Sequence, residues 1–324
     1  MGEARRAAIA LAHALGFDEV AAAQAGIVAT ELANNIVRHA KSGEIVLRSF
    51  DHSIESGTSG LEILAIDRGP GIANVSAAFT DGFSTAGTPG NGLGAVKRLS
   101  TVAEVYTEPS HGTVVLARLQ PRPAGKSNST LEFGAVCLPK SGEEICGDAW
   151  AAEPDSSGRT AIVVADGLGH GPLAAAASGL AIRIFRDNMH LSSARIIEAI
   201  HSALRSTRGA AVAVAEVFRN RREISFTGIG NISALIVSAT SLRSMVSLNG
   251  TAGAEARRIQ TFTYPWPADS LLVMHSDGLA SQWSLTRHPG LRFKHPSLVA
   301  ATLYRDFCRQ RDDVTVLVAR DATA

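Results

Sequence analysis

The chain has 324 residues, of which 45% are hydrophobic and 19% are charged, and its formal net charge is +1. This balance is typical of a globular chain with a packed core and excludes a largely disordered one. The length predicts about two domains. Because the Lys and Arg residues are spread along the chain, we expect no nucleic-acid partner.

The chain has three cysteines, Cys137, Cys146 and Cys308. They lack C-x-x-C spacing, which argues against a disulfide framework or a structural zinc and fits a reducing compartment. No apolar run reaches the roughly 18 residues that a membrane span needs. The N-terminal stretch imitates a signal peptide, but His13 interrupts its apolar run, and Asp18 and Glu19 charge its cleavage region. We therefore predict a cytoplasmic protein with no membrane partner.

A proline-rich and polar stretch divides the chain. Residues 121–130 read Pro-Arg-Pro-Ala-Gly-Lys-Ser-Asn-Ser-Thr, a composition that sustains neither helix nor strand. We predict a first domain over residues 1–120, a linker over 121–130 and a second domain over 131–324. Both domains are expected to mix helices and strands, so the predicted fold class is α+β.

The first domain is expected to be an α/β sandwich, with helices on a mixed or antiparallel sheet. Asp18 can cap a long helix that runs to about His39. The predicted strands cover residues 44–50, 61–66, 102–107 and 113–119. A further helix is predicted over residues 91–99, where a glycine-rich loop ends.

The second domain is expected to be a β-sandwich covered by helices. Predicted strands cover residues 131–137, 160–165, 211–217, 223–227, 233–237, 270–275 and 314–319. Predicted helices cover residues 172–188, 193–206 and 296–308.

Four pieces of the first domain could form a nucleotide site. Glu31 and Asn35 lie four residues apart on the long helix and project from one face, where an acid and an amide could bind a metal and orient a hydroxyl. Asp67, at a strand end, could accept a hydrogen bond from a base amino group, and Thr113 begins the last strand. Glycines that allow close backbone approach or expose N–H groups to phosphates are Gly69, Gly71, Gly90, Gly92 and Gly94. Taken singly, each piece also fits a polar helix surface or a simple turn.

In order and spacing these pieces resemble the N-box, G1 box and G2 box of the GHKL ATPase/kinase superfamily. Within it, residues 14–17 and 29–35 are similar to the RsbT-type kinases of bacterial stress signalling, and the resemblance covers nearly all of residues 1–120. It implies that Glu31 polarises the acceptor hydroxyl as general base, that Asn35 holds Mg²⁺ against ATP and that Asp67 binds adenine. It also implies that Gly92 and Gly94 line the phosphates, while residues 72–90 form a lid.

Four aspartates of the second domain lie at the ends of predicted strands: Asp148, Asp166, Asp277 and Asp312. Any one Asp-Gly pair also fits a turn. If the strand ends converge, each pair of carboxylates about 4 Å apart repels by about 4 kcal/mol at an effective dielectric near 20, which a fold tolerates only with cations. A site with oxygen ligands alone favours Mg²⁺ or Mn²⁺ over zinc.

Residues 165–171, 228–233 and 311–315 resemble the PPM metal-dependent Ser/Thr phosphatases and, among them, the SpoIIE/RsbU/RsbX group, most of all the RsbX type. The match spans about residues 131–320 and implies a PPM-type αββα sandwich. It implies that two ions are held by Asp148, Asp166, the Gly167 carbonyl, Asp277 and Asp312. Asp313 is expected to support this set, and His170 could donate a proton to a leaving oxygen or be a structural residue.

Together the two halves predict a bifunctional bacterial partner-switching regulator. It would phosphorylate Ser or Thr of a STAS-domain antagonist or scaffold protein with ATP, and hydrolyse phospho-Ser/Thr with a dinuclear Mn²⁺ or Mg²⁺ site. Its output would be control of a sigma factor, as in stress-response and stressosome signalling. Two alternatives stay open: an ATP-dependent anti-sigma or partner-binding module fused to an active phosphatase, and a non-catalytic scaffold.

Overall fold

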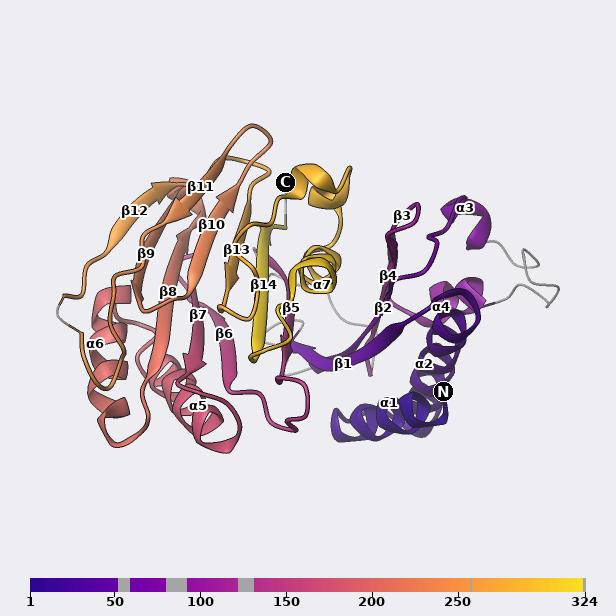
Figure 1. Cartoon of the computed structure of the whole chain (residues 1–324), viewed down its shortest axis with the longest axis horizontal. Helices are drawn as coiled ribbons and strands as arrows, with labels where there is room; N and C mark the ends of the chain where they lie inside the picture. Colours follow the sequence, from indigo (N-terminus) through magenta and orange to yellow (C-terminus); the bar gives the residue numbers. More distant parts are fainter. Residues whose placement is uncertain (52–58, 80–91, 122–130, 257, 323–324) are drawn as a thin grey trace. The chain divides into compact units, whose positions relative to one another are not determined.

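The computed structural model describes residues 1–51, 59–79, 92–121, 131–256 and 258–322 (Figure 1). Contacts between residues divide the chain into two compact units. Unit 1 comprises Met1–Ser129 with Leu285–Arg305, and unit 2 comprises Thr130–Ser284 with Asp306–Ala324. The sequence prediction assigned all of residues 131–324 to the second domain. The structure differs for Leu285–Arg305, which packs with the first unit.

Unit 1 contains an antiparallel sheet. Its strands are β1 (Gly43–Asp51), β2 (Ser59–Asp67), β3 (Val102–Glu108) and β4 (Gly112–Leu119). They lie in the order β1-β2-β4-β3, and every pairing between them is antiparallel. Of the mixed and antiparallel sheets that the sequence allowed, the antiparallel one is formed by the described strands.

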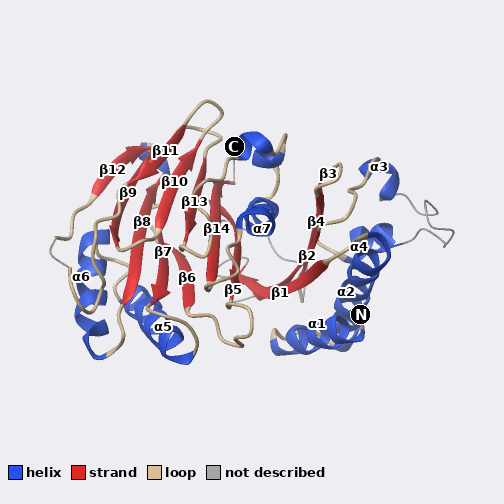
Figure 2. Ribbon diagram, in the orientation of Figure 1, coloured by secondary structure: helices blue, strands red, loops and turns tan. Residues whose placement is uncertain are grey.

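Helices cover one face of this sheet (Figure 2). They are α1 (Gly2–Ala14), α2 (Glu19–His39), α3 (Val75–Ala78) and α4 (Gly92–Leu99). The side chain of Asp18 accepts a hydrogen bond from the Ala21 N–H at 2.8 Å, so α2 begins at the predicted cap. Leu32 of α2 is fully buried with Leu61 and Ile63 of β2 in the core between helices and sheet.

The other face of the sheet is covered by the segment at residues 285–305. It contains the short 3₁₀ helices η3 (Leu285–Arg287) and η4 (Leu291–Phe293), followed by α7 (Pro296–Phe307). Because side chains alternate along a strand, Glu62 points away from the helical face to which Leu61 and Ile63 point. The Glu62 carboxylate accepts hydrogen bonds from Ser297 Oγ at 2.8 Å, Arg118 Nε at 2.7 Å and Arg48 Nε at 2.5 Å.

The charge of Glu62 is therefore compensated inside the unit. Its side chain is fully buried, and burial by itself raises its pKa. The guanidinium charges of Arg48 and Arg118 and the hydrogen bonds from Arg48 and Ser297 outweigh burial and lower the pKa to about 2. His288 adds a second tie between the segment and the sheet, with its Nδ1 2.7 Å from Glu108 Oε1.

Unit 2 is a sandwich of two antiparallel sheets. The strands are β5 (Leu131–Leu138), β6 (Asp148–Pro154), β7 (Arg159–Gly167), β8 (Ala210–Phe218), β9 (Glu223–Ile229), β10 (Ser233–Val237), β11 (Leu242–Met245), β12 (Phe262–Pro265), β13 (Leu271–His275) and β14 (Val314–Asp321). Among the described residues, one sheet has the order β11-β10-β13-β14-β5 and the other the order β12-β9-β8-β7-β6. A core that includes Ile162, Phe226, Met274 and Leu317 fills the space between them.

Two helices cover the β12-β9-β8-β7-β6 sheet on its outer face (Figure 1). They are α5 (Pro172–Asp187) and α6 (Ser193–Ala203), and short 3₁₀ helices follow at η1 (Leu204–Ser206) and η2 (Arg219–Arg221). The second apolar layer, between these helices and the sheet, includes Val163, Phe185 and Ile197. The covered sandwich that the strand and helix pattern predicted is confirmed for this sheet. Within the described residues, no helix combines the length and hydropathy needed to cross a lipid bilayer.

Candidate active sites

In unit 1, the N-terminus of α4 lies against the acid and amide of α2. A β-carbon placed on Gly92 would lie 3.1 Å from Glu31 Oε2 and 3.6 Å from Asn35 Oδ1. A side chain at this position would make the Glu31 carboxylate shift by a few tenths of an ångström, so glycine suits this close approach. The structure thus brings together three predicted site residues that are up to 61 positions apart in the sequence.

Asp67 forms a second group at the end of β2. Its Oδ1 accepts hydrogen bonds from the Gly69 N–H at 2.7 Å and from the Thr113 N–H at 3.2 Å. Within the described residues, no hydrogen bond reaches Oδ2, so one carboxylate oxygen remains for a ligand. Thr113 is buried and its hydroxyl lies 3.0 Å from the Thr107 hydroxyl, which fixes the start of β4 beside Asp67.

The remaining predicted glycines have different surroundings. Gly71 has a φ of +82°, and a β-carbon there would lie 2.5 Å from the Glu108 carbonyl oxygen, so its role is a tight turn against the end of β3. Gly94 is buried on α4, two residues beyond Gly92. Gly90 lies outside the described residues, as does most of the predicted lid over residues 72–90.

In unit 2, two of the predicted aspartates face each other across neighbouring strands. Asp148 begins β6, and the antiparallel register of β6 with β7 places it opposite Asp166. Residues opposed in this way have their β-carbons about 5 Å apart. The Gly167 N–H donates to the Gly147 carbonyl at 3.1 Å, so the hydrogen bonding of the strand pair continues past the acids. Two carboxyl groups are thus held side by side by the backbone.

The pKa values of these acids report their burial first and then their mutual repulsion. The pKa of Asp166 is raised to about 9, first by burial and then by the negative charges of Asp148, Asp277 and Asp312. The pKa of Asp148 is raised to about 6, again mainly by burial, although hydrogen bonds from Ser276 and Thr315 lower it. Burial and the charge of Asp312 raise the pKa of Asp277 as well. The four aspartates that the sequence singled out therefore act on one another electrostatically.

Neighbouring polar groups orient two of these carboxylates. Ser276 Oγ donates to Asp148 Oδ2 at 2.6 Å, and the Thr315 N–H donates to Ser276 Oγ at 2.9 Å, which directs the serine proton toward Asp148. Asn231 Nδ2 donates to Asp277 Oδ2 at 2.8 Å. Sequence reasoning did not assign these roles to Ser276 and Asn231. Their only signals were that Ser276 directly precedes Asp277 and that Asn231 lies in the stretch 228–233, which resembles the PPM phosphatases.

The last acidic pair lies against the loop that follows β13. A β-carbon on Gly278 would lie 2.0 Å from the Asp313 carbonyl oxygen, so only glycine fits there. Asp313 is 3% exposed; its Oδ1 accepts from the Lys140 N–H at 2.8 Å, while its Oδ2 has no hydrogen-bond partner. The Asp312 carboxylate accepts from the Asp313 N–H at 3.0 Å. Both acids therefore contribute charge to the cluster.

The donors present fit hard divalent cations. The buried Asp148 Oδ1 and Asp313 Oδ2 lack hydrogen-bond partners, although buried carboxylate oxygens are normally satisfied. These two atoms are carboxylate oxygens, the donor type that suits Mg²⁺ or Mn²⁺. No three His, Cys, Asp or Glu side chains of the described ranges converge tightly enough to coordinate a single ion. An ion bound here would therefore have to keep water molecules among its ligands, as Mg²⁺ commonly does.

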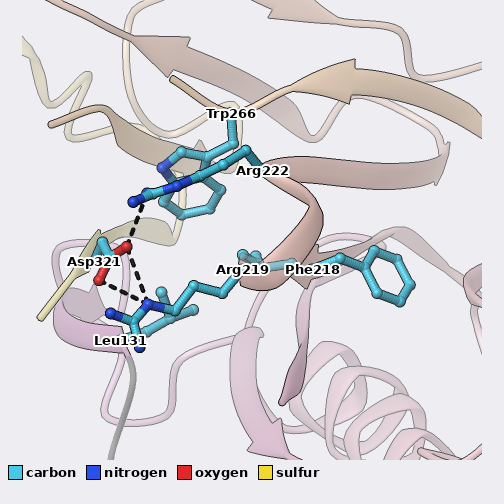
Figure 3. A pocket seen from close by; sticks show the side chains of 7 residues that line it. Leu131, Phe218, Arg219, Arg222, Trp266 and Asp321 are labelled. Carbon is cyan, nitrogen blue, oxygen red and sulfur yellow. Dashed lines mark hydrogen bonds and ion pairs between the residues drawn. The ribbon is translucent and has the colours of Figure 1, made fainter. Parts of the chain in front are cut away.

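The three cysteines are free thiols. Cys137 Sγ and Cys146 Sγ are 3.7 Å apart, beside the start of β6. A small recess elsewhere in unit 2 is lined by Leu131, Val217, Phe218, Arg219, Arg222, Trp266 and Asp321 (Figure 3). Ion pairs from Arg219 and Arg222 to Asp321 cross it, and it shares no residue with the acidic cluster.

Comparison with known proteins assigns both parts of the chain. Residues 156–321 match the model of the family described as Stage II sporulation protein E (SpoIIE), which is half of the chain. The chain belongs to the SpoIIE family. Residues 1–119 match the histidine kinase-like ATPase domain, so this SpoIIE-family chain carries an ATPase-type domain ahead of its phosphatase-type domain.

Individual relatives show the same division. Serine/threonine-protein kinase RsbT of Bacillus subtilis is 37% identical over 107 residues, which are 33% of this chain and 78% of that protein. Phosphoserine phosphatase RsbX of Bacillus subtilis is 26% identical over 155 residues, which are 48% of this chain and 77% of that protein. The predicted fusion of an RsbT-like domain with an RsbX-like domain is therefore confirmed.

One solved structure is reported under the words "The bacterial stressosome: a modular system that has been adapted to control secondary messenger signaling". It matches with a TM-score of 0.55 and 30% identity, covering 59% of this chain and all of that chain.

Proposed function

We propose that this SpoIIE-family chain is a two-way regulator of a partner-switching system. The first unit would transfer a phosphoryl group from Mg²⁺-ATP to Ser or Thr of a STAS-domain antagonist or scaffold protein. The second would hydrolyse phospho-Ser/Thr on the same protein or a related one. The proposal is supported most directly by the presence of two separate acid-containing sites in one chain, one around Glu31, Asn35 and Gly92 and the other around Asp148 and Asp166.

The residues of unit 1 suit phosphoryl transfer. The N–H groups at the start of α4 can donate hydrogen bonds to phosphate oxygens, and a helix N-terminus also carries a partial positive charge. Asn35 Oδ1 can hold Mg²⁺ at this point, and Glu31 can take the proton of the attacking hydroxyl. Asp67 Oδ2 can accept a hydrogen bond from the adenine amino group. The side chains given these roles are all partly exposed.

The residues of unit 2 suit phosphate ester hydrolysis. Asp148, Asp166, the Gly167 carbonyl, Asp277 and Asp312 would hold two Mn²⁺ or Mg²⁺ ions. When bound, such ions activate water and neutralise charge on a phosphoryl group. Ser276 keeps the Asp148 carboxylate in a fixed orientation through its 2.6 Å hydrogen bond, and Asn231 does the same for Asp277. Fixed carboxylates keep the donor set preorganised for the ions.

The partner is proposed from chemistry and relatives together. RsbT and RsbX are by name a serine/threonine-protein kinase and a phosphoserine phosphatase, and both resemble parts of this chain. One structural relative belongs to work on the bacterial stressosome. A stressosome-type STAS protein is therefore the substrate that we propose for both units.

Labelled ATP tests this proposal. The full chain is incubated with [γ-³²P]ATP, Mg²⁺, Mn²⁺ and a STAS protein from the same genome, and phosphoprotein is followed in time. We expect Asp277→Asn to accumulate phosphoprotein and Asn35→Ala to make none. If both variants behave like the wild-type chain, the proposal is wrong. ATP binding without label transfer to any STAS protein would instead support the alternative, in which the first unit only binds a partner.

A further inference from the structure

Three large aliphatic side chains are exposed on segments next to the acidic cluster of unit 2. Ile145 is 48% exposed, Leu168 is 47% exposed and Leu173 is 58% exposed. Ile145 precedes Asp148 by three residues, and Leu168 follows Asp166 by two. Single exposed aliphatic residues are common on protein surfaces, but a group of them beside a charged site indicates a binding function. We refer to these three residues as the aliphatic rim.

Contacts between the segments show that the rim is one surface. Glu143 Oε1 is 2.7 Å from His170 Nδ1, which joins the loop before β6 to the turn after β7. At the other end of the same loop, a β-carbon on Gly147 would lie 2.8 Å from the Ala174 β-carbon. Residues 143–147 therefore run along residues 170–174. Ile145 lies between these two points of contact on its own segment. On the facing segment Leu173 also lies between them, and Leu168 lies two residues before His170.

An arginine from another segment adds a positive charge to this surface, which also carries the exposed Glu144 beside Ile145. The Leu168 N–H donates to the Gly209 carbonyl at 3.0 Å, and Arg208 Nη1 lies 3.1 Å from the position of a β-carbon on Gly169. Arg208 is exposed, and it has no ion-pair partner among the residues that the structure describes. A phosphorylated side chain, which carries about −1.5 to −2 charges at pH 7, is complementary to this arginine.

We propose that the aliphatic rim and Arg208 form the docking surface for the phosphorylated segment of the substrate protein. This inference rests on the phosphatase activity proposed above and adds a substrate preference: aliphatic residues next to the phosphoserine or phosphothreonine pack on the rim. We assign this surface to the substrate protein because the phosphoryl group of the substrate must reach Asp148 and Asp166. The peptide segment that carries the phosphoryl group then crosses the segments next to these two aspartates. Arg208 attracts the phosphoryl group to this surface.

Two phosphothreonine peptides test the rim. They are identical except that leucine flanks the phosphothreonine in one and serine in the other, and p-nitrophenyl phosphate is the reference substrate without a chain. The full-length wild-type chain and the Ile145→Ser and Leu173→Ser variants are assayed with Mn²⁺. Leu242→Ser is the matched control, because Leu242 on β11 is 54% exposed and lies outside the rim. Melting temperatures verify that the wild-type chain and every variant, including the Arg208→Gln variant, are folded.

We expect the wild-type chain to prefer the leucine peptide. For each protein, kcat/KM for the leucine peptide is divided by kcat/KM for p-nitrophenyl phosphate. Each rim variant should lower this ratio about tenfold, which is typical of one lost aliphatic contact. The control keeps the wild-type ratio. Arg208→Gln lowers kcat/KM for both peptides. It also removes most of the salt dependence of kcat/KM. Equal ratios in all variants overturn the docking surface while the hydrolysis itself stands. Absence of Mn²⁺-dependent hydrolysis of p-nitrophenyl phosphate by the wild-type chain refutes the proposed phosphatase activity and this inference with it.

Discussion

Replacing Asp166 with asparagine should stabilise the metal-free chain. Asp166 has a pKa raised to about 9, against 3.8 for an unperturbed aspartate, mainly because of burial and the charge of Asp148. A carboxyl group whose pKa is raised on folding costs stability as the pH rises above its unfolded-state pKa. At 1.36 kcal/mol per pH unit, this cost reaches about 4 kcal/mol at pH 7. Repulsion between opposed carboxylates about 5 Å apart, about 3 kcal/mol at an effective dielectric near 20, is of the same size.

The assay is urea unfolding of the full chain at pH 7, in EDTA and again in Mn²⁺. In EDTA we expect Asp166→Asn to raise the free energy of unfolding of unit 2 by about 2 to 4 kcal/mol. Burial and Asp148 force the wild-type carboxyl to stay protonated in the folded state at pH 7, and asparagine does not carry this cost. In Mn²⁺ the wild-type chain should gain stability through ion binding, and the variant should lose most of that gain.

Asp155→Asn is the matched control. The pKa of Asp155 is lowered, because hydrogen bonds from Ser157 and Arg159 outweigh its burial. Replacing it should therefore destabilise the chain by a similar amount with and without Mn²⁺. As the pH falls toward about 4, the advantage of Asp166→Asn should shrink, because Asp166 then stays protonated on unfolding. The reasoning is refuted if Asp166→Asn destabilises the metal-free chain, or if Mn²⁺ stabilises that variant as much as the wild-type chain.

Three further substitutions test other parts of the account. Glu62→Gln should lower the free energy of unfolding of unit 1 by about 3 kcal/mol at pH 7, because the Glu62 pKa is lowered from 4.5 to about 2. This stabilisation is present above pH 4.5 and is lost as the pH falls toward 2. Urea unfolding at several pH values measures it. Ser276→Ala removes the 2.6 Å hydrogen bond to Asp148 and should raise the Mn²⁺ concentration for half-maximal hydrolysis of p-nitrophenyl phosphate about tenfold; an unchanged value contradicts the orienting role. Gly278→Ala would place a β-carbon 2.0 Å from the Asp313 carbonyl oxygen, so we expect a lower melting temperature and loss of hydrolysis, whereas wild-type behaviour would show that this contact is dispensable.

The elements and acidic motifs could be predicted because their signals are local. Asp18 caps α2 where its sequence position indicated, and Glu31 and Asn35 share a helix face because they are four residues apart. Asp166 was recognisable because an apolar strand ends in an acid and a glycine. The sequence did not determine that Asp148 lies directly opposite Asp166, because that register depends on the pairing of β6 with β7.

The packing of the segment at residues 285–305 on unit 1 could not be predicted. Glu62 bonds to residues that are 14, 56 and 235 positions away, and no periodicity in the sequence connects such distant positions. One signal was available in β2, where Leu64 and Ile66 are as buried as Leu61 and Ile63 although they point to the opposite face. A strand that is apolar on both faces requires a cover on both. The sequence shows this requirement, but not which segment meets it.

The central claim is that carboxylates from distant segments of unit 2 close around two divalent ions. Anomalous scattering from a crystal of the full chain grown with Mn²⁺ tests it most directly. We predict two manganese peaks among the carboxylates of Asp148, Asp166, Asp277 and Asp312, with Asp148 and Asp166 in contact with both ions. Manganese bound elsewhere, or no anomalous peak among these four side chains at saturating Mn²⁺, would contradict the claim.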